Sequence, residues 1–221
     1  FNKDGEEQWV RLLATADTER PTAMTTGEDG SIYITGFTKG DLNGQYLSNK
    51  GKQDAFVSKF TSDGTELWTT LLGTTKHECA TAITIGIDGS IYISGYSTNV
   101  NTSINGLDLY LEEWQSQHLE NSDIFIGKLD SDGNEIFSTS YGTTDIESAT
   151  GLATGKDGSI YLTGYKLGFE NHENKVVSES IESFVTKFKD DNIYETDEKS
   201  PNPTPDPAPT PDPAPTPDPA P

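Results

Sequence analysis

An eight-residue pattern that occurs three times constrains this chain more than any other feature. The pattern reads Asp-Gly-Ser-Ile-Tyr, then Ile or Leu, then Thr or Ser, then Gly, and its copies occupy residues 29–36, 88–95 and 157–164. The copies start 59 and then 69 residues apart. A repeat of this length is typical of solenoids and propellers. We therefore treat the chain as an array of one structural unit.

The residues around each copy repeat as well. An aromatic residue lies 24 positions before each tyrosine, and another lies in a later segment that contains a lysine three residues after it. A residue that is present in every copy is expected to build the unit, because a catalytic site is needed only once. The expected structural positions are Trp9, Tyr33, Phe56, Trp68, Tyr92, Phe125, Phe137, Tyr161 and Phe184.

Each unit predicts four short antiparallel strands. In the first copy they cover residues 8–14, 22–26, 32–37 and 55–60, where aromatic and aliphatic residues gather between turns. Asp-Gly supplies the positive-φ residue that tight hairpins need. The strand at 32–37 is apolar on both faces, so we expect it to be covered on both faces.

These features predict an all-β fold, namely a partial β-propeller with three blades of four antiparallel strands. The propeller repeats are expected to fill residues 1–190. The blades are expected at about residues 4–62, 63–131 and 132–190.

The order of the repeated blocks resembles the bacterial seven-bladed β-propeller repeat, known as the SBBP repeat. The blocks are Asp-Gly-Ser-Ile-Tyr-Ile-Thr-Gly, Asp-Ala-Phe-Val-Ser-Lys-Phe and Asp-Gly-x-x-x-Trp followed by Leu-Gly-Thr. The resemblance covers all three copies and departs in the third, where Phe137 replaces the tryptophan. It implies a β-propeller of surface or secreted bacterial proteins, in a family with no catalytic residues of its own. An extracellular or cell-surface location is expected.

The last part of the chain, residues 191–221, is expected to be a linker that is first acidic and then proline-rich. Eleven of the 12 prolines stand at every second position of residues 201–221. Such a segment cannot pack a core, and we expect a disordered, extended polyproline-II tail of roughly 65 Å. The alternative is a ligand for an aromatic-lined peptide-binding domain.

The charge of the chain limits its partners. With 36 acidic and 15 basic side chains the formal net charge is -21, which disfavours nucleic acid and anionic lipid as partners. No apolar run approaches the roughly 18 residues of a membrane span, so membrane insertion is not expected. The single cysteine, Cys79, excludes an internal disulfide framework and is expected to be a buried small residue.

Calcium is the one cofactor that the sequence suggests. Asp130, Asp132 and Glu135, and also Asp41 and Asn43, place oxygen ligands around a glycine as calcium loops do. Neither segment completes the calcium-loop pattern. A simple hairpin turn is the alternative interpretation, and without calcium no cofactor is expected.

The ten additional residues of the second unit lie in a loop at residues 98–121. This loop is apolar at several positions, and a short helix is expected at residues 109–118. Tyr110, Trp114 and His118 are therefore candidates for contact with an unknown protein or glycan ligand. The alternative is a lid that folds over its own blade.

The sequence contains no nucleophile elbow, phosphate loop or dinucleotide fingerprint. We interpret the chain as a non-enzymatic β-propeller repeat module that serves in binding, display or adhesion. The alternatives are a carboxylate-based hydrolase or lyase with its site at the propeller channel, and a calcium-stabilised propeller. Phe1 aligns with Phe60 and Leu129, which predicts further blades upstream or self-association.

Overall fold

The computed structural model describes residues 3–42, 53–98, 122–143, 145–172 and 175–188. Within these ranges the chain forms eleven antiparallel strands and no α-helix, so the all-β prediction is confirmed. The strands are β1 (Glu19–Thr26), β2 (Ile32–Thr38), β3 (Asp54–Phe60), β4 (Glu66–Leu72), β5 (His77–Ile85), β6 (Ile91–Thr98), β7 (Ser122–Leu129), β8 (Glu135–Tyr141), β9 (Ile146–Thr154), β10 (Ile160–His172) and β11 (Lys175–Phe188).

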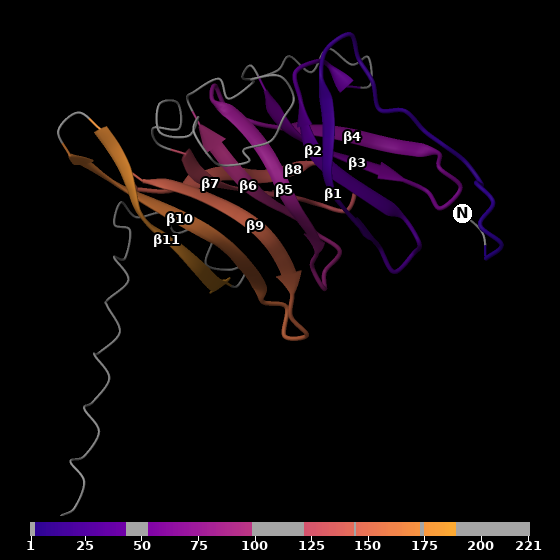
Figure 1. Cartoon of the computed structure of the whole chain (residues 1–221). Coiled ribbons are helices and arrows are strands. Elements are labelled where there is room, and N and C mark those ends of the chain that lie inside the picture. The colour runs from indigo at the N-terminus through magenta and orange to yellow at the C-terminus, as the bar shows by residue number, and fades with distance from the viewer. Residues whose placement is uncertain (1–2, 43–52, 99–121, 144, 173–174, 189–221) are drawn as a thin grey trace, which may run out of the picture.

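The strands form three sheets that follow one another along the chain. The first sheet has the order β1-β2-β3-β4, the second β5-β6-β7-β8 and the third β9-β10-β11. The sheets stand face to face, with the N-terminal segment at one end of the stack and β10 and β11 at the other (Figure 1). The third sheet contains three strands among the described residues, where four were expected in every blade.

The boundaries of the sheets and those of the sequence units are offset by one strand. β4 carries Trp68 and opens the second sequence unit, yet it pairs with β3 and completes the first sheet. β8 carries Phe137 and pairs with β7 in the same way. The second and third units thus begin with the outer strand of the preceding sheet.

The strand predicted at residues 8–14 is not formed, and that prediction was wrong. A strand needs a neighbour to pair its backbone groups, and no sheet edge lies beside this segment among the described residues. Instead, Trp9 Nε1 donates to the Ser62 carbonyl oxygen at 3.2 Å, and Arg11 Nε donates to the Gly64 carbonyl oxygen at 2.8 Å. These bonds hold the segment against the turn between β3 and β4.

Apolar side chains fill both spaces between the sheets. Tyr33 and Val57 of the first sheet pack with Ile93 and Phe125 of the second. Ile126 on the other face of the second sheet belongs to a separate cluster. The other main members of that cluster are Phe137, Leu162, Phe184 and Phe188. The second sheet is therefore covered on both faces, and burial of this apolar surface stabilises the stack.

The glycine that ends each eight-residue pattern allows two strands to approach closely. We call the first strand of each sheet (β1, β5 and β9) its inner strand. A Cβ on Gly36 or Gly95 would lie 1.9 Å from a carbonyl oxygen of the inner strand beside it, and one on Gly164 would lie 2.2 Å from the equivalent oxygen. Beside each of these glycines the pairing register shifts by one residue. The final glycine thus makes room for a bulge in the inner strand.

Each bulge directs a threonine toward the next sheet. Thr22 Oγ1 in β1 donates to the Ala80 carbonyl oxygen in β5, and Thr81 Oγ1 in β5 donates to the Ala149 carbonyl oxygen in β9 at 2.6 Å. Thr150 is the equivalent residue of the third sheet, where its side chain is exposed. Thr150 Oγ1 makes a 3.5 Å contact within its own sheet. In the first and second sheets, the threonine at the bulge therefore bonds to the sheet that follows it along the chain.

Candidate functional site

A cluster of aspartate, lysine and tyrosine recurs beside the first turn of each sheet. In the second sheet the Lys128 ammonium lies 5.2 Å from the centre of the Tyr92 ring and 4.0 Å from Asp88 Oδ2. Asp88 accepts hydrogen bonds from the Ser90 backbone N–H at 3.0 Å and from Ser90 Oγ at 2.8 Å. The equivalent groups are Asp29, Tyr33 and Lys59 in the first sheet and Asp157, Tyr161 and Lys187 in the third. Three equal copies indicate a structural role.

These contacts favour the charged form of the carboxylates. The hydrogen bond from Lys187 holds the pKa of Asp157 well below its ordinary value, and the same contact raises the pKa of Lys187. Burial raises the pKa of Asp88, but hydrogen bonds from Ser90 and the charge of Lys128 outweigh it, so the net pKa is lowered. The aspartates of the clusters are thus ionised at neutral pH.

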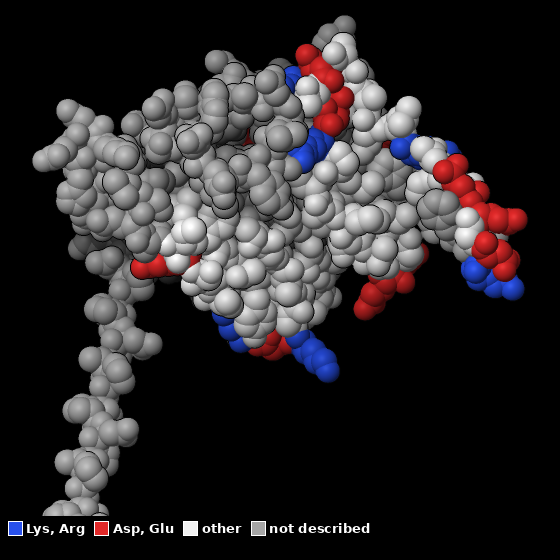
Figure 2. All heavy atoms as spheres, viewed as in Figure 1, with Lys and Arg blue, Asp and Glu red and all other residues white. Residues whose placement is uncertain are grey.

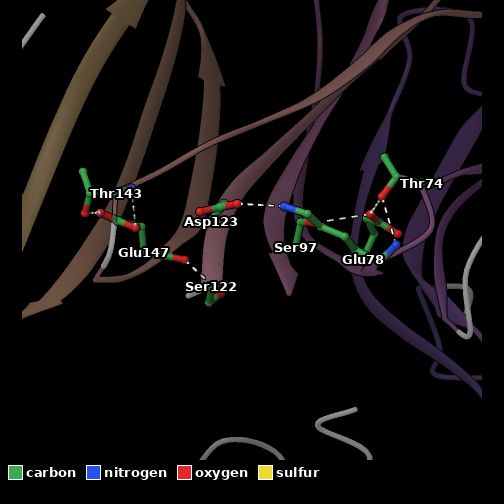
Figure 3. A network of polar contacts seen from close by, with 8 residues as sticks. Thr74, Glu78, Ser97, Ser122, Asp123, Thr143 and Glu147 are labelled. Carbon is green, nitrogen blue, oxygen red and sulfur yellow. Dashed lines mark hydrogen bonds and ion pairs between the residues drawn. The ribbon is translucent and has the colours of Figure 1, made fainter. Parts of the chain in front are cut away.

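A second set of polar groups lies at the opposite end of the strands (Figure 3). Glu78 at the start of β5 is fully buried and accepts hydrogen bonds from the hydroxyls of Thr74 and Ser97. Beside it, Lys76 Nζ lies 3.0 Å from Asp123 Oδ2 at the start of β7. These residues tie the link before β5 to the start of β7.

The third sheet carries a related arrangement around Glu147. Glu147 accepts a hydrogen bond from the Thr143 hydroxyl and lies 3.8 Å from Lys166 Nζ. Ser122 Oγ of the second sheet donates to the Glu147 carbonyl oxygen at 3.2 Å, which joins the two sheets (Figure 3). The sequence analysis missed these glutamates. The signal was a threonine four residues before a glutamate in every unit, at Thr15, Thr74 and Thr143.

The predicted calcium residues lie in the turn between β7 and β8. Asp130 Oδ1 accepts from the backbone N–H groups of Asp132 and Asn134 at 2.9 Å each, and Oδ2 accepts from Asn134 Nδ2 at 2.8 Å. Glu135 accepts from the Ser138 hydroxyl. The part of the chain that the structure describes contains no group of three or more His, Cys, Asp or Glu side chains placed to hold a metal ion. The calcium hypothesis stays a prediction.

The other predicted positions differ in where they lie. Tyr110, Trp114 and His118, with the helix expected at residues 109–118, fall outside the described residues. Most of the nine repeated aromatic positions lie in the spaces between the sheets or on the buried faces of their strands. Phe56, Phe125, Tyr33 and Tyr92 are buried, and Trp68, Phe137, Tyr161 and Phe184 are half-buried. Trp9 is the exposed exception.

A cleft of about 700 Å³ opens where the three inner strands end. It collects the ends of β1, β5 and β9 and the turns that follow β1 and β5. Its main lining residues are Thr25, Thr26, Glu28, Asp29, Tyr33, Lys59, Ile83, Thr84, Ile85, Ile87, Leu152, Ala153 and Thr154. Sequence reasoning missed the cleft because these residues come from three units and meet only in the folded stack.

The cleft combines apolar surface with hydrogen-bonding groups. Thr84 Oγ1 lies 3.1 Å from Thr154 Oγ1, which donates to the Ile85 carbonyl oxygen at 2.8 Å. Hydrogen bonds from Ser31 and the nearby Lys59 lower the pKa of Asp29, so this carboxylate is charged. The cleft thus offers hydroxyls, a carboxylate and an ammonium beside aliphatic side chains, which suits a polar organic ligand.

The outer surface is unevenly charged. In the view of Figure 2, charged side chains gather at the N-terminal segment and along the edges, while the surface over β5 and β9 is largely uncharged. Among the described residues, no helix has the length and apolar character to cross a membrane.

The chain is similar to part of a known bacterial protein. No protein-family model matches the chain. The chain is similar to a protein of Caulobacter vibrioides named regulatory protein FlaEY, with 30% identity over 145 residues, which is 63% of this chain. The chain spans 15% of the length of that relative.

Proposed function

We propose that this chain is a non-enzymatic β-propeller repeat module, of the SBBP type, that binds a protein or glycan ligand for a secreted or cell-surface bacterial protein. Three face-to-face antiparallel sheets that follow a repeated sequence support the propeller assignment. Display or adhesion is the role that fits such a module. The name of the similar Caulobacter protein, a regulatory protein, is compatible with a module that binds.

The cleft at the ends of the three inner strands is the observation that carries this proposal. Its volume of about 700 Å³ falls within the range of ligand sites, roughly 300 to 1,000 Å³. Its threonine hydroxyls and the Asp29 and Lys59 charges supply the few polar groups that orient a ligand. A ligand bound in this cleft would contact residues of all three sheets.

The alternative of a carboxylate-based hydrolase or lyase has less support. A glutamate recurs in each unit, buried in the second and third units and half-buried in the first, and accepts a hydrogen bond from a neighbouring threonine. The aspartates of the turns are likewise bonded to neighbouring serines. Groups that recur with the same internal partners favour a structural role over acid-base catalysis.

A glycan and protein array tests the proposal. The intact chain is compared with Ala153→Trp, which fills the cleft from an exposed position on β9 without removing a hydrogen-bonding side chain. Ala16→Trp, an exposed alanine that does not line the cleft, is the matched control. We expect a ligand that the wild type and the control bind and that Ala153→Trp binds at least about tenfold more weakly. Equal binding by all three proteins would contradict the cleft as the site, and no ligand at all would contradict the binding role.

A further inference from the structure

Residues 7–13 have the sequence of an outer strand, although they form no strand in the structure. They read Glu-Gln-Trp-Val-Arg-Leu-Leu and align with Glu-Leu-Trp-Thr-Thr-Leu-Leu in β4 and with Glu-Ile-Phe-Ser-Thr-Ser-Tyr in β8. β4 and β8 are the outer strands of their sheets, whereas residues 7–13 form no strand. Val10 and Leu12 remain 57% and 87% exposed. A segment with an outer-strand sequence and exposed apolar side chains is suited to pair with another sheet edge.

The position of the segment is also that of an outer strand. A Cβ on Gly64 would meet the Trp9 ring at 2.7 Å, and a Cβ on Gly133 would meet the Trp68 ring at 2.6 Å. Trp9 thus packs on a turn of the first sheet as Trp68 of the first sheet packs on the same turn of the second. Residues 7–13 occupy the place that the outer strand of a preceding sheet would occupy.

The third sheet lacks an outer strand in the part of the chain that the structure describes. Among the described residues no strand lies beyond β11, whereas the equivalent β3 and β7 each pair with an outer strand. Val185 in β11 is 76% exposed, while the equivalent Val57 and Ile126 are 0% and 8% exposed. In the first and second sheets, the next sheet covers the equivalent face. The open face of the third sheet carries the equivalent side chains, but no sheet covers it within the described ranges.

The first sheet presents the surface that would cover it. Met24 is exposed and Ile34 is half-buried in the first sheet, whereas Ile83 and Ile93 at the same positions of the second sheet are buried against the first. The chain thus carries both halves of the contact that its own sheets make twice.

We propose that residues 7–13 of one copy of this chain add to β11 of a second copy as its fourth strand. The third sheet of the second copy then packs on the first sheet of the first copy. The pairs β3–β4 and β7–β8 fix the register: Lys187 lies opposite Trp9, and Val185 lies opposite Arg11. Strand addition supplies backbone hydrogen bonds, and the apolar faces supply burial.

Two observations favour a second copy as the occupant of this edge. Residues 7–13 and β11 lie at opposite ends of the stack, so the two do not meet within one chain that keeps its Trp9 contacts (Figure 1). Residues 194–200 align with the same outer strand but read Tyr-Glu-Thr-Asp-Glu-Lys-Ser, with Thr196 at the aromatic position. This acidic sequence is poorer in strand-forming and apolar residues than residues 7–13.

The contact is of the head-to-tail kind, because it joins two different surfaces of the same molecule. Self-association, which the sequence predicts in general terms, therefore has a specific interface and register. The inference goes beyond the proposed ligand binding and rests on separate observations, namely the exposed side chains of residues 7–13 and of β11.

Light scattering coupled to size-exclusion chromatography tests the contact on the full chain. We expect the apparent mass to rise above the 24.0 kDa of one chain as the concentration increases from roughly 1 to 100 μM. Val10→Asp/Leu12→Asp places charges at the added strand, and Val185→Lys places a positive charge on the open face of the third sheet, opposite Arg11 of the added strand. All three side chains are exposed in the single chain, so the substitutions leave its fold intact. Each variant is expected to raise the apparent dissociation constant at least about tenfold.

A mixture of the two variants distinguishes head-to-tail pairing from non-specific association. The Val10→Asp/Leu12→Asp protein keeps an intact β11, and the Val185→Lys protein keeps intact residues 7–13. Their mixture is therefore expected to form a dimer of twice the chain mass, although each variant alone stays at 24.0 kDa. Leu67→Asp, which changes an exposed residue on an outer strand that already has its sheet, is the control and is expected to associate as the wild type does. A wild type that is monomeric throughout, or a mixture that stays monomeric, would overturn the proposal.

Discussion

Val57 and Val185 occupy the same repeat position, and comparing their truncation measures what packing between sheets contributes. Val57 is fully buried between the first and second sheets. Val57→Ala removes two methyl groups, which costs about 0.8 kcal/mol each in lost burial. A residual cavity of roughly 50 Å³ at about 24 cal/mol per Å³ adds about 1 kcal/mol. We expect the free energy of unfolding to fall by about 2 to 3 kcal/mol.

Val185→Ala is the matched substitution at an exposed position. Because the Val185 side chain is 76% exposed, its truncation is expected to change the free energy of unfolding by less than about 0.5 kcal/mol. Both substitutions are made in the Val10→Asp/Leu12→Asp background, so that association between copies does not cover Val185. The difference between the two valines then reports the covering by a neighbouring sheet alone.

Urea unfolding followed by tryptophan fluorescence measures both changes, since the chain contains three tryptophans. The dependence of the unfolding free energy on urea must stay the same in both variants for the comparison to hold. Equal losses at the two positions would refute the argument, because they would mean that sheet stacking does not decide the contribution of this position.

Three further substitutions test other parts of the fold. Gly95→Ala drives a Cβ into a backbone carbonyl of the neighbouring strand and is expected to cost about 2 kcal/mol or more in urea unfolding; a neutral effect would mean that the bulge is not tight. Thr81→Val removes the hydrogen bond to the third sheet and is expected to cost about 1 kcal/mol, while Thr150→Val, at an exposed side chain, costs less than about 0.5 kcal/mol; equal costs would contradict the inter-sheet role. The pKa of Asp157 is lowered in the folded state, so its stabilising effect is present above its ordinary pKa of about 4 and is lost as the pH falls. The melting temperature of the Asp157→Asn protein is therefore expected to fall less than that of the wild type between pH 5 and pH 3. An equal fall in the two proteins would contradict the contribution of the Lys187 contact.

The local signals in the sequence predicted most of the strands. Residues 22–26, 32–37 and 55–60 lie within β1, β2 and β3, because apolar content and Asp-Gly turns act over a few residues. Residues 8–14 have the same local signals and form no strand, because a strand also needs a partner that the local sequence does not specify. Pairing between distant segments is therefore where the sequence reasoning failed.

The candidate site could be predicted only in part for a related reason. The turn that holds Asp130 was visible as a turn, since its hydrogen bonds join residues two to four positions apart. The glutamates Glu78 and Glu147 were marked by a repeated spacing that the analysis did not use. The cleft had no sequence signal, because Thr25, Thr84 and their neighbours come together only when three sheets stack.

Two lysines of the repeated clusters show which property depends on the repeat itself and which depends on the neighbouring sheets. The property that depends on the repeat is the distance to the tyrosine ring, and the one that depends on the neighbours is the exposure of the side chain. Lys128 and Lys187 lie 5.2 and 5.3 Å from the rings of Tyr92 and Tyr161, so the contact within each sheet is the same. Their side chains are nevertheless 6% and 46% exposed. The lysine–tyrosine distances agree, although Lys187 lies closer to its aspartate (2.9 Å) than Lys128 does (4.0 Å). We attribute the greater exposure of Lys187 to the outer strand and the next sheet, which cover Lys128 and are absent around Lys187 in the described part of the chain. The open face of the third sheet thus keeps the lysine–tyrosine contact that a neighbouring sheet covers in the second sheet, which supports the proposed packing of a further sheet of the same repeat there.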